Sequence, residues 1–552
     1  MRTKAIAILM AVVCAAMLLF MKAGELRAQS TSALTGVVSS AEEGPMEGVI
    51  VSAKAPASTI TISVVTDNRG RYTFPAAKLP PATYDVKIRA VGYDLTAPAS
   101  ATVANGTTAS ADLKLRKVPD IALQLTDAEW VASMPGTDEQ KKMLANCNSC
   151  HSLQRVVYST WSAQEFAAII PRMNTYVNQS TAVHPQKRMA AGGYINADTI
   201  KALADYLATV NLHGRSYWSY PLKGFPRPTG AATHVIYTEY ALPRDTIEPH
   251  DVYLQGGRVW YSDFGEQFLG ALDPATGKVT EYRIPEMKAG YPTGELDLEP
   301  DKSGTLWLSG MYQGGLEAFD PKTSTFTAYP LPAAMNSTGA QQSMVMPNNS
   351  NVDGLVWTNN QDQRQILRLN VKTGTYDAQG PLKDPTAPDH VIGSYGLLSD
   401  SHNNAILLDY GGAGLAKLDA KTGAVTMYPT PTLHSAPRRG RVYGNDQVVF
   451  AEYGGDHVGT LDTHTGVVKE YATPPGTNPY DAFADKNGEI WEGSMWTDRV
   501  LRINPKTNVT TAYLLPHFTN IRRVFVDNST TPATFWVGNN HAASIVKLEP
   551  QN

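Results

Sequence analysis

The sequence predicts a mainly β, multidomain protein with an N-terminal β-sandwich, a small all-α domain and a C-terminal seven-bladed β-propeller. Its 552 residues are too many for one hydrophobic core. Short strand-like runs alternate with turns near the N-terminus, the middle of the chain has helical periodicity, and one turn motif recurs through the C-terminal half. These three patterns divide the chain into the three predicted folds.

Residues 1–28 predict a secretory signal peptide. Arg2 and Lys4 precede an apolar run of 16 residues from Ala5 to Phe20, and Ala28 ends a possible cleavage sequence. The run is short for a membrane span of about 20 residues, but an uncleaved anchor is the alternative. We therefore expect a periplasmic or secreted protein that meets a membrane only through an uncleaved leader.

Residues 31–116 predict a small antiparallel β-sandwich, because short strand-like runs are separated by strong turns. The turn Thr66-Asp67-Asn68-Arg69-Gly70, followed by Tyr72 and Phe74, resembles the carboxypeptidase regulatory-like domain. The resemblance implies a transthyretin-like sandwich with no chemistry of its own. The expected strands are Ala33 to Val38, Gly48 to Lys54, Thr59 to Val65, Tyr72 to Phe74, Thr83 to Arg89 and Thr107 to Leu115.

Residues 120–215 predict a helical domain that carries the most informative motif, Cys147-Asn148-Ser149-Cys150-His151. C-x-x-C-H is the attachment motif of haem c: the two thiols bind the haem vinyl groups and the histidine ligates the iron. The chain has three cysteines, and Cys14 lies in the predicted leader. A disulfide would close a very short loop, and a zinc site would need a second Cys or His pair. Helices are expected from Thr126, over Thr137 to Leu153, over Ser162 to Ile170 and over Asp198 to Val210.

The helices around this motif resemble those of a small class I cytochrome c. The run from Phe166 to Met173 resembles the segment in which such cytochromes place an Arg-Met pair at a helix end, which implies that Met173 is the second axial ligand of the iron. Met189 and His184 are the alternatives, and either methionine could instead fill the core.

Residues 230–552 predict a propeller, because the turn Asp-Pro-x-Thr-Gly recurs every 42–50 residues. A strand containing tryptophan precedes most copies, and the segment Val235 to Tyr240 could complete the last blade and close the ring. Seven turns predict seven blades. The copies begin at Asp273, Asp320, Asn370, Asp419, Asp462, Asn504 and Glu549.

The stretches Thr246 to Val252, Arg258 to Asp263 and Val279 to Pro285 resemble the virginiamycin B lyase (streptogramin lyase) family. The resemblance implies a magnesium-dependent enzyme that opens a cyclic depsipeptide by elimination, with Glu248 and His250 as its catalytic pair. The family's second histidine has no match, since His517 lies six residues too early, and its later acid could be Asp263 or Glu266.

The inner strands predict a funnel that suits an anionic or aromatic ligand at least as well as a depsipeptide. Its expected lining is basic and aromatic, although Glu248 and His250 could also be blade residues without a catalytic role. The lining residues are His250, Tyr395, Tyr480, Arg438 or Arg439, and Arg522 or Arg523.

Composition narrows the function classes. The net charge of −4 gives no basic footprint for nucleic acid. We expect an exported c-type cytochrome whose propeller binds a small-molecule substrate or a redox partner protein, with haem-linked oxidoreductase activity as one outcome. The first alternative is a magnesium-dependent lyase, and the second is a non-enzymatic binding scaffold. Redox chemistry ranks first because an elimination needs no electrons.

Overall fold

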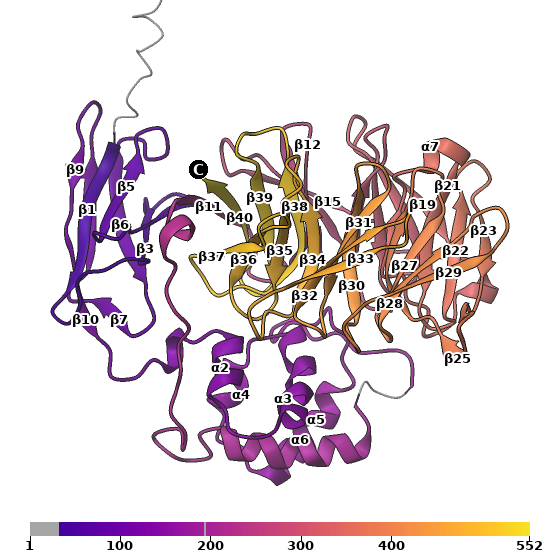
Figure 1. Ribbon diagram of the computed structural model, residues 1–552, viewed down its shortest axis with the longest axis horizontal. Helices are drawn as coiled ribbons and strands as arrows, with labels where there is room; N and C mark the ends of the chain where they lie inside the picture. The colour runs from indigo at the N-terminus through magenta and orange to yellow at the C-terminus, as the bar shows by residue number, and fades with distance from the viewer. Residues whose placement is uncertain (1–31, 192–194, 552) are drawn as a thin grey trace, which may run out of the picture.

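The computed structural model describes residues 32–191 and 195–551 (Figure 1). A β-sandwich lies at one end of a ring of β-sheets, and a helical segment covers one face of that ring. The predicted signal peptide, residues 1–28, lies outside the described residues. Among the helices of the described ranges, none is long and apolar enough to cross a membrane.

The sandwich packs two sheets around a core that includes Leu34, Val51 and Phe74. Alternating buried and exposed residues, as in β6, turn one side of each strand toward this core. One sheet contains β1 (Ser32–Ser40), β2 (Gly44–Pro45), β5 (Arg71–Pro75), β7 (Tyr93–Leu95), β9 (Ala109–Ser110) and β10 (Leu113–Lys117); the other contains β3 (Ile50–Lys54), β4 (Ile60–Val65), β6 (Ala82–Arg89) and β8 (Ala99–Val103).

The prediction of a wholly antiparallel sandwich is wrong at β1, which pairs parallel with both β9 and β10. The run predicted as one strand from Thr107 to Leu115 divides at Ala111 and Asp112, where Asp112 Oδ1 accepts a hydrogen bond from Val37 N (2.9 Å). Gly36 permits this close passage, because a Cβ atom there would lie 1.9 Å from Ala111 O. Alternation along a strand predicts its two faces but not the direction of its partner.

Most α-helices of the helical segment, residues 122–210, begin at a capping side chain. Thr126, Thr137 and Ser162 each form a capping box with the residue three positions later. The continuous helix predicted over Thr137 to Leu153 is wrong: a short α3 changes to a 3-10 helix that carries Cys147. The elements are η1 (Ala122–Gln124), α2 (Asp127–Ser133), α3 (Asp138–Lys142), η2 (Met143–Ser149), α4 (Gln154–Val157), α5 (Ala163–Met173) and α6 (Ala197–Val210).

The ring consists of seven four-stranded antiparallel blades, of which six are separate sheets and the seventh is part of a larger sheet. The first strand of each blade contacts the first strand of the next, and β12 contacts β38, so the ring closes. Blades 1 to 3 are β12 (Pro249–Gln255), β13 (Arg258–Asp263), β14 (Phe268–Leu272) and β15 (Val279–Arg283); β16 (Glu295–Pro300), β17 (Leu306–Gly310), β18 (Gly315–Asp320) and β19 (Thr325–Pro330); and β20 (Val345–Met346), β21 (Leu355–Asn360), β22 (Gln365–Asn370) and β23 (Thr375–Gln379).

Blades 4 to 7 repeat the arrangement, and three short helices and one hairpin lie outside the blade strands. Blades 4 and 5 are β26 (Ser394–Ser399), β27 (Ala405–Asp409), β28 (Gly414–Leu418) and β29 (Val425–Pro429); and β30 (Pro437–Tyr443), β31 (Gln447–Glu452), β32 (His457–Asp462) and β33 (Val468–Ala472). Blades 6 and 7 are β34 (Pro479–Ala484), β35 (Ile490–Ser494), β36 (Arg499–Asn504) and β37 (Val509–Leu514); and β38 (Ile521–Asp527), β39 (Thr534–Asn539), β40 (Ser544–Pro550) and β11 (Val235–Ala241). The remaining elements are η3 (Gly230–Thr233), η4 (Ala333–Met335), α7 (Ser350–Asp353), β24 (Lys383–Asp384) and β25 (Ala387–Val391).

The repeated turn joins the third and fourth strands of a blade. In the first copy, Asp273 Oδ1 accepts a hydrogen bond from Ala275 N (2.9 Å) and Gly277 has a φ of 71°, which explains the Asp and Gly of the motif. The recurring tryptophans are buried in second strands; Trp260, for example, packs on Phe319 of the next blade. The repeated motif therefore marks the turn of each blade, and the recurring tryptophan marks a contact between neighbouring blades.

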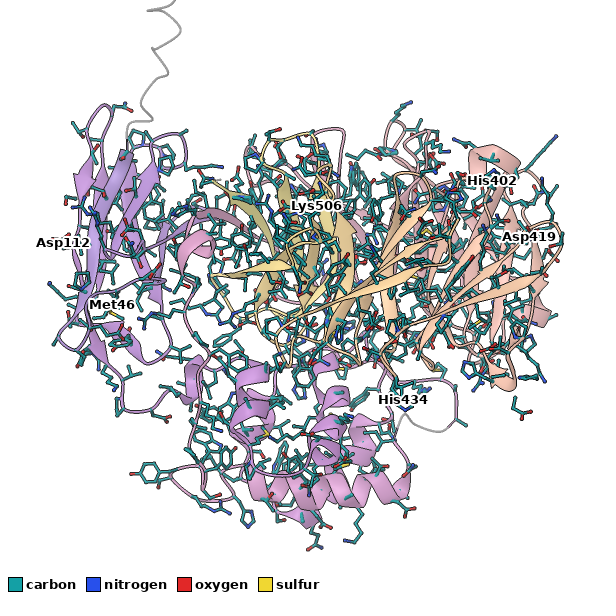
Figure 2. The ribbon with its side chains drawn as sticks, viewed as in Figure 1. Met46, Asp112, His402, Asp419, His434 and Lys506 are labelled. Carbon is teal, nitrogen blue, oxygen red and sulfur yellow. The ribbon has the colours of Figure 1, made fainter. Side chains whose placement is uncertain are left out.

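The predicted N-terminal closing strand is confirmed, since β11 pairs with β40 and completes blade 7. Its other edge pairs with β4 of the sandwich, from Ile236 opposite Val64 to Tyr240 opposite Ile60, so sandwich and blade form one eight-stranded sheet. The sandwich thereby covers an edge that the closing strand would otherwise leave open. Figure 2 shows Asp112 in the sandwich at one end of the molecule and Asp419 of blade 4 at the other.

Candidate functional site

The Cys147 to His151 segment lies against the ring. Asn520 Nδ2 donates a hydrogen bond to Asn148 Oδ1 (2.7 Å), and Arg522 Nη2 donates one to Ser149 O (2.8 Å). Asn148 and Asn520 are fully buried, and Arg522 belongs to β38, the first strand of blade 7. The backbone between the two cysteines is thus fixed by the propeller.

A cavity of about 490 Å³ lies beside this segment. Cys150 and His151 of the helical segment line one side, and Glu248 and His541 of the ring line another. We call it the interdomain cavity. Its volume lies within the range of about 300–1,000 Å³ that is usual for small-molecule and cofactor sites. Apolar wall residues include Leu125, Val183, Ile247 and Phe518.

Two of the three side chains of the attachment motif line the interdomain cavity. Cys147 and Cys150 are unbonded thiols; Cys150 lines the cavity, whereas Cys147 packs among the hydrophobic residues of the helical segment. Burial raises the pKa of each thiol to about 12, so both are neutral at pH 7. His151 Nδ1 lies 2.9 Å from Ser152 O. A proton on Nδ1 would be donated to that carbonyl, which leaves Nε2 as the ligand atom.

Asp127 fixes the chain that follows the motif. Its Oδ1 accepts a hydrogen bond from Leu153 N (2.8 Å), and the side chain lines the interdomain cavity. Burial raises the pKa of Asp127 to about 7, against the hydrogen bond from Leu153, which lowers it. The sequence showed Asp127 only as the first residue of a short helix, and its approach to the motif is a tertiary contact.

Glu248 and His250 have different surroundings. Glu248 lines the interdomain cavity, and burial raises its pKa well above the usual range. His250 is fully buried: Nδ1 lies 2.6 Å from Asp251 Oδ1, and Nε2 lies 3.1 Å from the Tyr480 hydroxyl. Burial and the nearby Arg439 lower the pKa of His250 well below its usual value, so the ring is neutral and both nitrogens are engaged.

The predicted funnel residues meet at the ring axis. The Arg438 guanidinium lies 4.1 Å from the ring centre of Tyr480 and 5.0 Å from that of Tyr395. The hydroxyl groups of these two tyrosines are 2.6 Å apart. Arg439 and Arg523 are buried in ion pairs with Asp297. Tyr480 also packs in one hydrophobic cluster with residues of the helical segment, which therefore covers this region.

The expected second iron ligands lie elsewhere. Met173, at the end of α5, is 41% exposed and Met189 is 46% exposed, and neither these residues nor His184 line the interdomain cavity. His541 does line it, and its buried Nε2 has no hydrogen-bond partner within the described ranges. Burial lowers the pKa of His541 to about 3. Nothing in the sequence links a loop of the last blade with the cysteine motif.

The remaining lyase candidates are engaged in ion pairs. Arg244 bonds to Asp263 Oδ2 (3.1 Å) and also to Glu266, and His517 Nε2 lies 3.0 Å from Glu239 Oε2. Burial raises the pKa of Asp263 to about 7. These pairs hold the corners of blades 1 and 7 together.

Comparison with known protein families supports the predicted fold of the sandwich. Residues 33–116 match the carboxypeptidase regulatory-like domain family, in agreement with the sequence prediction. None of the curated protein sequences matches the chain.

Among solved structures, a streptogramin B lyase is 21% identical over 58% of this chain and 99% of its own, with a TM-score of 0.48. A virginiamycin B lyase from Staphylococcus aureus is 18% identical over 57% of this chain and 99% of its own, with a TM-score of 0.48. The extracellular domain of a one-component system from B. thetaiotaomicron is 16% identical over 55% of this chain and 40% of its own, with a TM-score of 0.42. The ring topology is defined by its own strand pairing, and these structures leave its activity open.

Proposed function

We propose that this protein is an exported c-type cytochrome in which the propeller completes the pocket of a covalently bound haem. The observation that carries the proposal is that Cys150 and His151 share one cavity with Glu248 and His541. Three features fit a haem: two unbonded thiols at the attachment spacing, apolar side chains such as Val183 and Phe518 in the cavity wall, and a histidine whose Nδ1 faces a carbonyl oxygen.

Cys147 and Cys150 would hold the haem, and His151 would ligate its iron. We propose His541 as a second iron ligand, because it lines the cavity and its buried Nε2 has no hydrogen-bond partner within the described ranges. Met173 remains the first alternative and Met189 the second. When bound, the haem supplies a centre that accepts and releases one electron.

Two ring residues of the cavity wall carry no charge at pH 7, although Arg155, Asp245 and Asp498 also line the cavity. The raised pKa of Glu248 and the lowered pKa of His541 leave both side chains neutral at pH 7. Burial and the polarity of the surrounding groups are the means by which a protein tunes a haem potential. Paired arginines and tyrosines fill the ring axis. We therefore propose that the haem exchanges electrons with a redox partner protein, and not with a substrate bound at the axis.

Elimination chemistry with magnesium receives less support. His250 has both ring nitrogens engaged, and Asp263 and Glu266 are paired with Arg244. These residues offer no free oxygen cluster for Mg²⁺, so we derive no step through that ion.

The test is production of the full chain in a host that attaches haem c. We expect haem that remains bound after denaturation and a reversible c-type α-band on reduction. Purified, folded protein without covalent haem from that host would overturn the proposal.

A further inference from the structure

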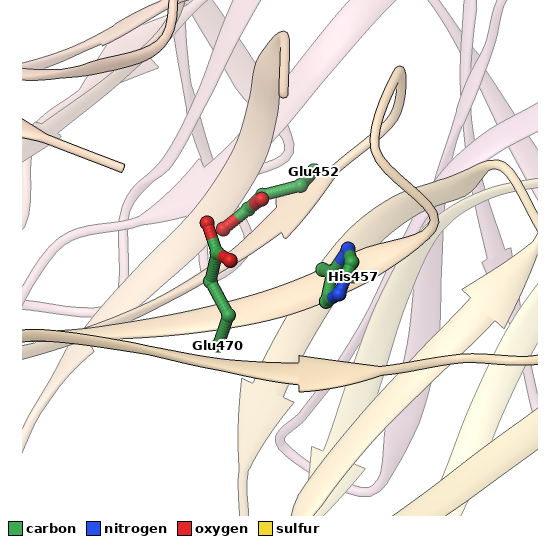
Figure 3. Close-up of side chains that lie close together, drawn as sticks. All are labelled: Glu452, His457 and Glu470. Carbon is green, nitrogen blue, oxygen red and sulfur yellow. The ribbon is translucent and has the colours of Figure 1, made fainter. Parts of the chain in front are cut away.

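A second cluster of ligand-type side chains lies in blade 5, away from the interdomain cavity. Glu452 ends β31, His457 begins β32, and Glu470 lies in β33. One ligand atom from each lies within 4.8 Å of the others. Figure 3 shows the carboxylates of Glu452 and Glu470 turned toward one another, with the imidazole of His457 beside them. We call these residues the blade-5 cluster.

Glu452 has no cation beside it among the residues that the structure describes. It is fully buried, and neither carboxylate oxygen accepts a hydrogen bond from an N–H or hydroxyl group of those residues. Burial and the adjacent Glu470 raise the pKa of Glu452 to about 9, so without a metal it holds a proton at pH 7. A buried ionised carboxylate is costly unless it is paired or binds a metal. The neighbouring Glu470 adds a second carboxylate rather than a cation.

In blade 1 the positions equivalent to Glu452 and Glu470 also hold carboxylates, and an arginine lies between them. The pairing of Pro437 with Glu452 in blade 5 matches that of Pro249 with Asp263 in blade 1. Glu470 likewise matches Glu281, since each lies opposite a glycine of the third strand. The blade-1 carboxylates are neutralised by Arg244, which lies 3.1 Å from Asp263 and 2.5 Å from Glu281.

In blade 7 the outer-strand carboxylate is paired with a histidine instead of an arginine. Its Glu239 occupies the outer-strand position of Glu281, and His517 from the linker before the blade lies 3.0 Å from it. In blade 5 the linker residue that reaches Glu470 is Thr432, which carries no charge. The blade-5 corner thus keeps both carboxylates and lacks the cation.

The surrounding hydrogen bonds orient the blade-5 side chains as metal ligands are usually oriented. His457 Nδ1 lies 2.6 Å from Gly455 O, so a proton there leaves Nε2 with its lone pair. Thr432 N and Oγ1 donate to the two oxygens of Glu470, each at 2.8 Å. Bonds of this kind from ligands to backbone and hydroxyl groups are typical of metal sites.

We propose that Glu452, His457 and Glu470 bind a divalent transition-metal ion, which takes the place that Arg244 fills in blade 1. One imidazole and two carboxylates suit Zn²⁺ or a neighbouring metal better than Mg²⁺. Bonds of about 2.0–2.2 Å keep two ligand atoms within about 4.4 Å, so side-chain shifts of less than about 1 Å would close the cluster on an ion.

Zn²⁺ is the probe for the test. The full chain is stripped with chelator, equilibrated with Zn²⁺ and dialysed, and zinc per chain is measured by mass spectrometry, which separates it from haem iron. We expect Glu452→Gln and His457→Ala each to lose one zinc per chain relative to wild type. Thr432→Arg, which imports the blade-1 cation and keeps all three ligands, should lose it too.

The matched control is His464→Ala, since His464 is an exposed histidine in the next turn of the same blade. This variant should keep the wild-type zinc content. Wild type that binds no zinc, or zinc that persists in Glu452→Gln and Thr432→Arg, overturns the proposal; in the first case a proton shared by the two carboxyls is the occupant. The result is independent of haem attachment, so it can fail while the proposed function stands.

Discussion

The interdomain cavity and the blade-5 cluster both bury polar atoms without partners, but they are assembled differently. The cavity joins His151 of the helical segment with Glu248 and His541 from blades 1 and 7. The blade-5 cluster comes from neighbouring strands of one sheet, and its counterparts in blades 1 and 7 pair a carboxylate with Arg244 or His517. The first arrangement depends on how the helical segment docks on the ring. The second lies within one blade, so it can be compared with the equivalent positions of the other blades.

The largest effect should follow removal of the thiols at the cavity. Cys147→Ser combined with Cys150→Ser should abolish covalent haem, because no other described cysteine is present. Haem that remains bound after denaturation, measured by absorbance, is the readout. Cys14→Ser should keep the full haem content, and covalent haem in the double variant would contradict the assignment.

The cavity should also make stability depend on pH through Asp127. Its pKa rises from 3.8 in the unfolded chain to about 7 in the folded protein, so the folded state holds the proton more tightly. The free energy of unfolding should therefore fall as pH rises from about 4 to about 7, by at most about 4 kcal/mol at 1.36 kcal/mol per pKa unit.

Asp127→Asn tests this dependence because it removes the titration and keeps an acceptor for Leu153 N. Denaturant unfolding of wild type and variant at pH 5 and pH 8 gives the difference. The variant should lose that part of the pH slope. An identical slope in both proteins would show that Asp127 does not titrate in this range.

The corner of blade 1 should depend on its cation. Arg244→Ala leaves Asp263 buried without its charge partner and should lower the free energy of unfolding by about 2–3 kcal/mol, less than for a fully buried pair because Arg244 is partly exposed. Arg283→Ala is the control, since its pair with Glu286 is on the surface and should change stability by less than about 1 kcal/mol. Equal effects of the two variants would remove the basis for comparing blades 1 and 5.

The smallest effect is expected for the side chain that holds the motif against blade 7. Asn520→Ala removes the bond to Asn148 and the bond that Asn520 Oδ1 accepts from Arg522 Nε, and it should cost about 1–3 kcal/mol, since Asn148 is left buried without this partner. Thermal unfolding measures the change. Asn487→Ala, an exposed turn residue of blade 6, should leave the transition unchanged; an equal shift in both would argue against a docked motif.

Sequence patterns predicted the features that repeat or are local. The Asp-Pro-x-Thr-Gly turn gave the seven sheets because Asp273 and Gly277 are required by the turn itself. Thr126 and Ser162 marked helix starts because capping is a local interaction.

Contacts between distant segments could not be predicted. The pairing of β11 with β4 and the approach of His541 to His151 depend on how domains dock, and neither leaves a periodic pattern. The parallel pairing of β1 with β10 was missed for the same reason, because a partner's direction is set by the chain's path. The sequence contains Glu452 and Glu470, but only the strand register shows that they occupy the positions at which blade 1 has carboxylates paired with an arginine.

The most direct test of the account is the ferric absorption and EPR spectrum of the full-length, haem-loaded His541→Ala variant beside Met173→Ala. If the propeller completes the haem pocket, His541→Ala keeps covalent haem but changes from a low-spin to a high-spin spectrum, and Met173→Ala matches wild type. Unchanged spectra in His541→Ala, with the change appearing in Met173→Ala, would contradict a pocket closed by the propeller.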